Sequence, residues 1–379
     1  MKSNITQTRL GILGGGQLGR MLIQESINLN LSVSILDPDK NAPCKNICDY
    51  FEVGELSDYE TVYNFGKRVD LVTIEIEKVN VEALEALEKE GVTVFPQSRI
   101  IRLIQDKGLQ KQFFKENDIP TADFQLISDR AQLLDENLSL PFIQKLRKDG
   151  YDGKGVVKIS TQTDYDKAFD APSIVEKNID FEKEISVIIA RNEKGQIKTF
   201  PLVEMDFNAE ANLVEYLISP STYPFEIQQK AEKIATDIAN SLNIVGILAV
   251  EMFLTSDGNI LVNELAPRPH NSGHQTIEGN RTSQFMQHLR AILNLPLGST
   301  EAIGNAIMVN LLGEKGYEGP ALYKGLKEVL KKEGIYVHLY GKKLTKPFRK
   351  MGHVTIVDND REKAIEKAKF VKDTLKVIA

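Results

Sequence analysis

Two glutamates are predicted to face each other across a β-hairpin near the middle of the chain. The stretch AVEMFLTSDGNILVNEL alternates apolar and polar residues on both sides of a turn at Asp257-Gly258. If the turn is centred on these two residues, position 254 pairs with position 261 and Glu251 pairs with Glu264. A register slipped by one residue, which would turn one glutamate toward solvent, is the structural alternative.

Such a carboxylate pair has an evident chemical use. Like charges on directly opposed strands are unfavourable, and the apolar neighbours of Glu251 and Glu264 increase that cost. A divalent cation reverses the sign of the interaction, and a site with few oxygen ligands suits a Mg²⁺ ion that also binds nucleotide phosphates. Asn263 could add an amide oxygen. The hairpin therefore predicts a Mg²⁺ site.

A glycine-rich turn lies near the N-terminus. Gly14, Gly16 and Gly19 fit the pattern G-x-G-x-x-G between a predicted strand and a predicted helix, and Asp37 ends the next strand. This arrangement predicts a dinucleotide-binding enzyme of the NAD(P)-dependent oxidoreductase class. The same glycines would equally allow tight packing of the helix on the strand, or the approach of another phosphate or polar ligand to the backbone.

A second glycine-rich segment, GYDGKG at residues 150–155, lies between two predicted strands and is not a Walker A sequence. A loop of this kind can close over phosphates with its backbone amides and a lysine, and a plain flexible hairpin is the alternative. Lys145 lies within the preceding strand, where an apolar residue would be buried at a lower cost in free energy. Its presence favours the interpretation that it binds a phosphate.

Two further segments carry polar and basic groups. Residues 266–274, APRPHNSGH, contain Arg268, which we interpret as an anion clamp; His270 and His274 lack a third ligand at the spacing of a zinc site. Residues 342–353 concentrate lysine and arginine in an otherwise acidic chain. A phosphate-bearing substrate would explain that charge, and a solvated loop is the alternative.

Composition narrows the class of protein. The 379 residues include 47 Lys and Arg against 53 Asp and Glu, a net charge of −6, so nucleic acid is not expected as the main partner. Cys44 and Cys48 have no second Cys/His pair with which to form a zinc site. No apolar run is long enough to span a bilayer. We expect a cytoplasmic protein without a membrane anchor.

The elements that must position these groups fall into three units. Residues 1–97 alternate strands and helices, as in a parallel α/β sheet of Rossmann type. Residues 98–297 begin with a helical stretch over 98–117 and continue as a largely antiparallel α+β unit. Residues 298–379 provide three more strands and a final helix from 361 to the C-terminus.

Taken together and in this order, GGGQLGRM, TIEIE, GYDGKG, the Glu251 hairpin, NELAPRPHNSGH and RKMGH resemble the N5-carboxyaminoimidazole ribonucleotide synthetase family of the ATP-grasp superfamily. The resemblance covers nearly the whole chain. It implies a Rossmann-like pre-ATP-grasp domain, a central ATP-grasp domain and a small C-terminal domain that completes the substrate site.

The resemblance also implies a reaction. Enzymes of this family use MgATP to phosphorylate bicarbonate, and the carboxyphosphate, or CO2 released from it, carboxylates the amine of 5-aminoimidazole ribonucleotide in purine biosynthesis. The expected cofactors are ATP and one or two Mg²⁺ ions, with Mn²⁺ as a substitute. The expected partners are these small molecules and a second copy of the chain in a homodimer.

Residues are carried over by their match to the family motifs. The metal ligands are Glu251 and Glu264, and the catalytic candidates are Asp152, Lys350 and Arg268. The nucleotide residues are Lys107, Lys145, Tyr151, Asp152, Gly153, Lys154, Gly155, Glu176, Lys177, Asn178, Ile179, Glu184, Asn263 and Glu264, with 176–179 as the adenine hinge and Glu184 as the ribose acid. The ribonucleotide residues are Gln17, Leu18, Glu75, Asn271, Lys342, Arg349 and Lys350.

Asp152 and Lys350 are hypothesised to handle the proton of the amine and to orient the substrate. The chain departs from the family at Phe207, where a nucleotide-contacting histidine is common, and at Lys107, where some relatives have arginine. Besides the oxidoreductase, two alternatives stay open. They are the formate-dependent glycinamide ribonucleotide transformylase and a non-catalytic nucleotide-binding protein with the same fold.

Overall fold

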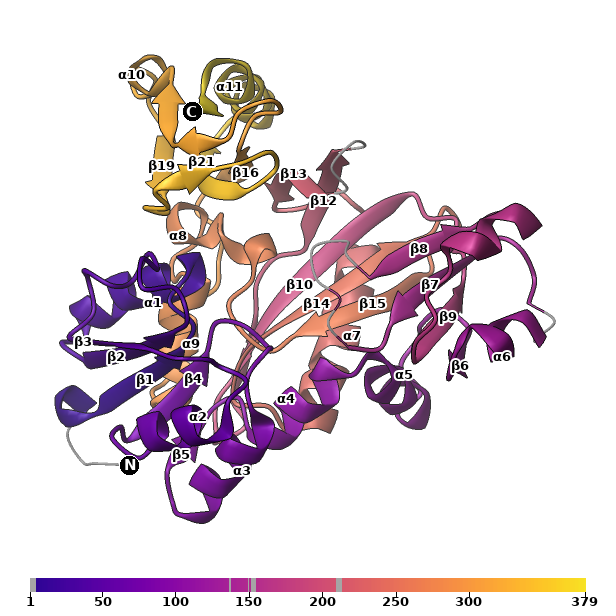
Figure 1. The fold of residues 1–379 in the computed structure, drawn as a ribbon. Coiled ribbons are helices and arrows are strands. Elements are labelled where there is room, and N and C mark those ends of the chain that lie inside the picture. The colour runs from indigo at the N-terminus through magenta and orange to yellow at the C-terminus, as the bar shows by residue number, and fades with distance from the viewer. Residues whose placement is uncertain (1–4, 136–137, 149, 151–154, 209–212) are drawn as a thin grey trace.

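The computed structural model describes residues 5–379 except 136–137, 149, 151–154 and 209–212. The chain forms three lobes (Figure 1), with the N-terminal lobe in indigo and the C-terminal lobe in yellow. Among the described residues, no helix combines the length and the apolar character needed to cross a membrane.

The N-terminal lobe is built on a five-stranded, fully parallel sheet, as predicted. The inner strands RLGIL and LVTI are nearly continuous apolar runs because helices cover both faces of the sheet. In sheet order the strands are β3 (Tyr50–Val53), β2 (Ser32–Asp37), β1 (Arg9–Leu13), β4 (Leu71–Ile74) and β5 (Thr93–Val94), and the helices are α1 (Gln17–Asn28), α2 (Tyr59–Gly66) and α3 (Val81–Lys89).

The helical stretch predicted over 98–117 is confirmed, as two helices, α4 (Ser98–Gln105) and α5 (Lys107–Glu116), with a break at Asp106. Asp106 adopts an extended backbone, and its carboxylate accepts hydrogen bonds from the amides of Gly108 and Leu109 at 2.8 and 3.2 Å. Arg147 binds the same carboxylate through two nitrogens, at 2.8 and 2.7 Å. This N-cap favours a new helix over a continuous one.

A small antiparallel sheet follows. Its strands, in sheet order, are β6 (Phe124–Ile127), β9 (Ser173–Lys177), β7 (Phe142–Leu146) and β8 (Val156–Ile159), and α6 (Arg130–Asp135) packs beside β6. Figure 1 shows this sheet beside the strands β10, β14 and β15. The glycine-rich segment connects β7 to β8, and most of it lies outside the described residues.

One long antiparallel sheet passes from the central lobe into the C-terminal lobe. Its path is β15 (Ile260–Ala266), β14 (Gly246–Leu254), β10 (Lys183–Arg191), β12 (Val203–Asn208), β13 (Leu213–Ser219), β16 (Asn305–Leu312), β21 (Lys350–Asp358) and β19 (Ile335–Leu339), and β11 (Ile197–Thr199) pairs with β10. The final helix α11 (Arg361–Thr374) ends earlier than predicted. Residues Lys376–Ile378 form β22, which pairs with β18 (Leu322–Lys324).

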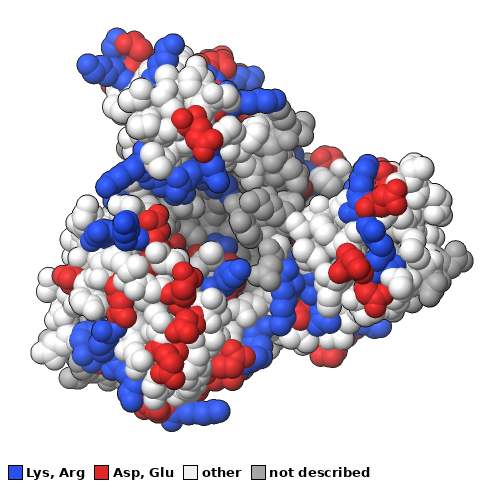
Figure 2. All heavy atoms as spheres, viewed as in Figure 1, with Lys and Arg blue, Asp and Glu red and all other residues white. Residues whose placement is uncertain are grey.

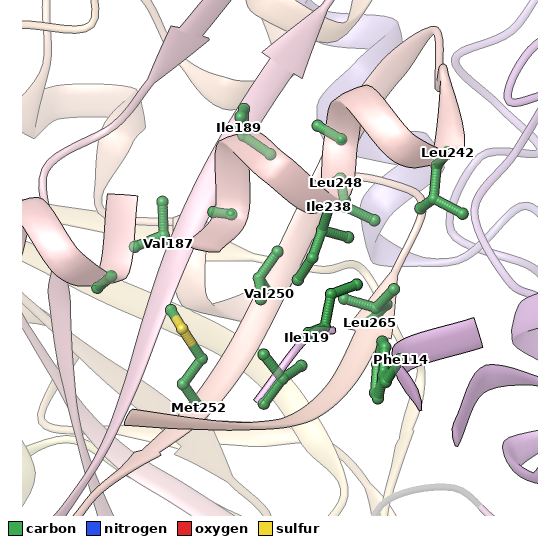
Figure 3. Packing of buried hydrophobic residues seen from close by; sticks show 14 of the residues in the cluster. Phe114, Ile119, Val187, Ile189, Ile238, Leu242, Leu248, Val250, Met252 and Leu265 are labelled. Carbon is green, nitrogen blue, oxygen red and sulfur yellow. The ribbon is translucent and has the colours of Figure 1, made fainter. Parts of the chain in front are cut away.

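The largest core lies between this sheet and α7 (Phe225–Leu242), which begins after Pro224. Figure 3 shows Ile238 and Leu242 of the helix beside Leu248 and Val250 of β14, and Phe114 of α5 closes one end of the cluster. The core fixes β14 and therefore the position of Glu251, whose strand neighbours are buried.

The central lobe is joined to the N-terminal lobe through α9 (Gln284–Ile292), which packs against α1. The buried His288 accepts a hydrogen bond from the amide of Ile247 at Nδ1, at 3.1 Å, and its Nε2 lies 2.9 Å from Thr73 Oγ1. Because Nδ1 accepts, the neutral ring carries its proton on Nε2 and donates it to Thr73. One imidazole thus joins β4 of the first lobe to β14 of the second.

Replacement of His288 by leucine should destabilise the protein by about 2 kcal/mol near pH 7, because the buried amide of Ile247 loses its acceptor. Burial lowers the pKa of His288 to about 3. Below pH ~6.5 the imidazole takes up a proton in the unfolded chain but stays neutral in the folded chain. The free energy of unfolding of the wild type therefore decreases as the pH is lowered from about 6.5 toward 3. The leucine variant has no imidazole and does not lose this contribution.

The measurement is urea unfolding followed by circular dichroism near pH 7 and near pH 5. The gap between wild type and His288→Leu should shrink by about 2 kcal/mol at the lower pH. An equal gap at both pH values would contradict the neutral, hydrogen-bonded imidazole.

Candidate active site

The hairpin of β14 and β15 carries the predicted carboxylate pair, although the strand pairing next to the turn differs from the predicted one. The amide of Gly258 (φ +77°) donates to the carbonyl of Thr255 at 2.9 Å, which makes a loop one residue longer than a two-residue turn. Leu254 therefore pairs with Ile260, and the predicted pairing of 254 with 261 is wrong.

A β-bulge then restores the predicted pairing of the glutamates. Met252 pairs with Val262 while Glu251 pairs with Glu264, so Asn263 is an extra residue on β15. The bulge turns the consecutive side chains of Asn263 and Glu264 toward the same face, whereas regular alternation would send one of them into the core. Both are partly exposed and both contact lysines.

Lysines from two other elements meet these side chains. Lys107 of α5 places Nζ 2.6 Å from Glu264 Oε2, and Lys145 of β7 donates to Asn263 Oδ1 at 2.9 Å. The site predicted from segments far apart in the chain is thus brought together between the small sheet and the end of the long sheet. Of the family-derived nucleotide residues, these contacts join Lys107, Lys145, Asn263 and Glu264.

The acidic groups of the site fall into two classes, one with a lowered pKa and one with a raised pKa. The ammonium of Lys107 lowers the pKa of Glu264, so this carboxyl is held ionised. Burial, reinforced by Glu264, raises the pKa of Glu251, and burial raises the pKa of Glu184 on β10 to about 7. Two acids in the cleft therefore favour proton uptake near neutrality unless a further cation joins them.

The donor set fits the expected Mg²⁺. Glu251 and Glu264 offer oxygen ligands on paired strands, and burial followed by the charge of Glu264 raises the pKa of Glu251. Within the described residues, no three His, Cys, Asp or Glu side chains form a metal site by themselves. A cation here would draw its remaining ligands from water and from a nucleotide. His270 Nε2 lies 3.5 Å from Glu251 Oε1.

The sequence interpretation missed Lys111, which occupies the centre of the lysine cluster. Its Nζ lies 2.5 Å from Glu176 Oε1, and Lys145 Nζ lies 2.6 Å from Glu176 Oε2. The side chains of Lys111 and Glu176 are only 3% and 5% exposed. A signal was present, because Lys111 lies three residues after the buried Gly108 and three before the buried Phe114, which is the spacing of one face of a helix.

The glycine turn serves a carboxylate of the protein itself. Glu75, just after β4, accepts hydrogen bonds from the amides of Gly16 and Gly19 at 2.6 and 2.5 Å, and Asp37 accepts from Gly15 at 2.6 Å. A Cβ at Gly16 would lie 2.5 Å from Glu75 Oε1, so glycine is required for this approach. The amides that a dinucleotide phosphate would use are occupied, and the oxidoreductase interpretation loses its main support.

The loop 266–274 connects all three lobes. Arg268 Nε lies 2.7 Å from Glu77 Oε1 of the N-terminal lobe. Asn271 and Asn310 exchange two amide hydrogen bonds, each of 3.0 Å, which ties the loop to β16. His274 is buried with its ring 4.8 Å from that of His353, on β21. Asn271 thus has a structural partner besides the ribonucleotide contact predicted for it.

The basic segment near the C-terminus borders the hollow between the lobes. Figure 2 shows lysine and arginine side chains gathered along the edge of the C-terminal lobe that faces this hollow. Lys342 Nζ donates to the carbonyl of Lys350 at 2.8 Å, and Arg349 Nη1 donates to the carbonyl of Leu344 at 2.8 Å. These contacts hold the basic residues together as a group.

The remaining predicted residues have varied surroundings. Leu18 is buried in the core of the N-terminal lobe, so its side chain faces away from solvent, while Gln17 begins α1. Phe207, where a nucleotide-contacting histidine is common in the family, packs against the buried cluster that contains Met205 and Leu217. Tyr151, Asp152, Gly153 and Lys154 lie outside the described residues. Gly155 (φ +75°) precedes β8; Lys177 ends β9, and Asn178 and Ile179 follow it.

Replacement of Lys107 by methionine should lower the stability by about 1–2 kcal/mol near pH 8, because the partly exposed Glu264 then faces Glu251 with its main cation removed. Addition of Mg²⁺ should raise the thermal midpoint of this variant more than that of wild type. Lys115→Met, at an exposed position of α5, is the matched control. Equal responses to Mg²⁺ in Lys107→Met and wild type would contradict a carboxylate pair that requires a cation.

Comparison with known families covers the three lobes separately. Residues 7–105 match the ribonucleotide synthetase pre-ATP-grasp domain, residues 112–285 match the ATP-grasp domain, and residues 306–367 match the C-terminal domain of phosphoribosylaminoimidazole carboxylase.

Individual relatives agree with these matches. N5-carboxyaminoimidazole ribonucleotide synthase of Bacillus subtilis is 37% identical over 364 residues, which cover 94% of this chain and 93% of the relative. The chain spans only 64% of phosphoribosylaminoimidazole carboxylase from Vigna aconitifolia, at 40% identity, and 36% of the bifunctional purC/E protein from Dictyostelium discoideum, at 39% identity.

Solved structures extend the comparison to the fold. N5-carboxyaminoimidazole ribonucleotide synthetase from Thermotoga maritima has 43% identity and a TM-score of 0.91, covering 98% of this chain and 100% of its own. The Aspergillus clavatus enzyme, solved with ADP and 5-aminoimidazole ribonucleotide, has 34% identity and a TM-score of 0.89, covering 97% and 98%. The chain therefore belongs to the N5-carboxyaminoimidazole ribonucleotide synthetase family of ATP-grasp ligases.

Proposed function

We propose that this chain catalyses the ATP- and bicarbonate-dependent carboxylation of 5-aminoimidazole ribonucleotide to N5-carboxyaminoimidazole ribonucleotide in purine biosynthesis. The observation that carries the proposal is the convergence of Lys107, Lys145, Asn263 and Glu264 between two antiparallel sheets, in a chain of this family. This cluster supplies cations and oxygen ligands where a nucleoside triphosphate would need both.

The proposed reaction has two steps. A bicarbonate oxygen attacks the γ-phosphorus of ATP, and carboxyphosphate and ADP form. The exocyclic amine then attacks the carboxyl carbon, either of carboxyphosphate or of the CO2 released from it. The new bond is C–N, the phosphate leaves, and the amine loses one proton. The protein must therefore bind several anions, spread the charge of the transferring phosphoryl group and accept a proton.

The nucleotide-binding roles follow from the contacts. Lys107 and Lys145 offer positive charge at the phosphate end, and Glu184, a half-buried acid on β10, is our candidate for the ribose hydroxyls. Glu251 and Glu264 would hold Mg²⁺, or Mn²⁺ as a substitute, and the ion would spread the charge of the transferring phosphoryl group. The hinge at Glu176, Lys177, Asn178 and Ile179 would contact the adenine.

For the substrate side, Arg268 is the proposed anion clamp, since its contact with Glu77 fixes the guanidinium. Glu75, Gln17 and the basic segment that contains Lys342, Arg349 and Lys350 would bind the ribonucleotide. We further propose a homodimer and a cytoplasmic location. Sedimentation velocity tests the homodimer and would show a monomer if that part is wrong.

The direct test is ADP release with MgATP and bicarbonate, with and without 5-aminoimidazole ribonucleotide, alongside transfer of labelled bicarbonate carbon into an acid-labile product. Both signals should rise together when the ribonucleotide is added. ADP release that ignores the ribonucleotide would contradict the proposed substrate, and oxidation or reduction of a nicotinamide cofactor would favour the oxidoreductase.

Asp152→Asn should abolish carboxylation while leaving the fold intact, because we propose that this carboxylate receives or orients the proton of the amine. The loss is expected to be about 100-fold or more in kcat, with circular dichroism and the thermal midpoint unchanged. Turnover near that of wild type would overturn this role.

A further inference from the structure

The ammonium group of Lys111 is enclosed by protein. It bonds Glu176 Oε1 at 2.5 Å and Thr121 Oγ1, and it lies 5.6 Å from the centre of the Phe114 ring. With 3% of its side chain exposed, Lys111 is too deep to contact a nucleotide in the cleft. A buried lysine is costly unless paired, so its presence requires a reason.

Glu176 is shared between two lysines of different exposure. One carboxylate oxygen binds Lys111 on the inside, and the other binds Lys145 at 2.6 Å on the side nearer the cleft, where Lys145 is 12% exposed. The three groups together carry a net charge of +1. Without Lys111, Glu176 and Lys145 would form a neutral pair, and the charge of Lys145 would be largely cancelled.

The net positive charge of the three groups lies on the ammonium of Lys145, on the side nearer the cleft. Among the residues that the structure describes, Lys145 bonds Glu176 and Asn263, at 2.6 and 2.9 Å, and an ammonium group has a third N–H that we assign to a ligand. Thr121, the other partner of Lys111, donates to the carbonyl of Val262 at 2.7 Å. Lys111 is therefore connected to the strand that carries Asn263 and Glu264 as well as to Glu176.

We infer that Lys111 is a positioning residue for nucleotide binding: from inside the protein it neutralises Glu176, and so leaves the charge of Lys145 available to the phosphates of ATP. This inference rests on the proposed function, in which Lys145 faces the nucleotide. It assigns a role to a side chain that never touches the ligand. Removal of Lys111 should weaken binding of an anionic nucleotide through the net charge of the triad.

The test is calorimetric titration with AMP-PNP and Mg²⁺ on the full chain. Lys111→Met and Lys111→Gln should each raise the Kd about tenfold, since both remove the charge and the glutamine keeps a polar group of smaller size beside Glu176. The glutamine variant also provides a measurement if the methionine variant does not fold. Lys115→Met removes an exposed lysine one turn later on α5, and it should bind like wild type.

The double variant Lys111→Met with Glu176→Gln separates charge from packing. It restores the net charge of +1, carried by Lys145, so its Kd should be lower than that of Lys111→Met. The comparison is made with that single variant, and not with wild type, because Glu176 also belongs to the proposed adenine hinge. A purely structural role predicts that the second substitution adds to the damage.

Three outcomes would overturn the inference. They are unchanged binding in Lys111→Met, unchanged binding in Lys111→Gln, or a double variant that binds more weakly than Lys111→Met. Wild-type protein that fails to bind AMP-PNP would overturn the proposed function as well, whereas equal binding by wild type and Lys111→Met would overturn this inference alone.

Discussion

Acidic side chains and lysines compensate one another where the small sheet meets the end of the long sheet. Lysines lie 2.5–2.6 Å from the carboxylates of Glu176 and Glu264. Without them, the buried Glu176 and the partly exposed Glu264 would lose the cations that compensate their charge. The arrangement remains incomplete at Glu251 and Glu184, whose pKa values are raised. Under the proposed function, a metal-bound nucleotide would bring a cation to these acids and an anion to the lysines.

Departures from regular secondary structure position these charged side chains. A bulge on β15 turns Asn263 and Glu264 to one face, and the break at Asp106 begins a new helix whose first residue is Lys107. In the N-terminal lobe, glycines allow the carboxylate of Glu75 to reach the backbone amides at the start of α1. His288 and the loop at Arg268 then connect the lobes, so that residues far apart in the sequence share one cleft.

Much of this could be predicted from the sequence. Alternation of apolar and polar residues identified the hairpin and the parallel sheet, because periodicity follows burial on each face. The pairing of Glu251 with Glu264 was predicted correctly although the expected turn was one residue too short, since the bulge offset that error. Family motifs identified the class of enzyme, and the comparisons confirm it.

The rest depends on contacts that local patterns do not encode. The break at Asp106 is stabilised by Arg147, which is distant in sequence, and the partner of Lys111 lies on β9. The glycine turn was misleading for a similar reason, because its amides bind Glu75 from the end of another strand. In each case a charged side chain that is distant in sequence determines the local structure, and the spacing of residues within the segment does not reveal it.

Transfer of oxygen from bicarbonate to phosphate would show whether ATP activates bicarbonate in this cleft. With bicarbonate labelled with ¹⁸O, each phosphate released in the presence of 5-aminoimidazole ribonucleotide should carry one labelled oxygen, because the attacking bicarbonate oxygen stays on phosphorus. Phosphate without the label would mean that water attacks ATP instead, and it would contradict the proposed activation of bicarbonate.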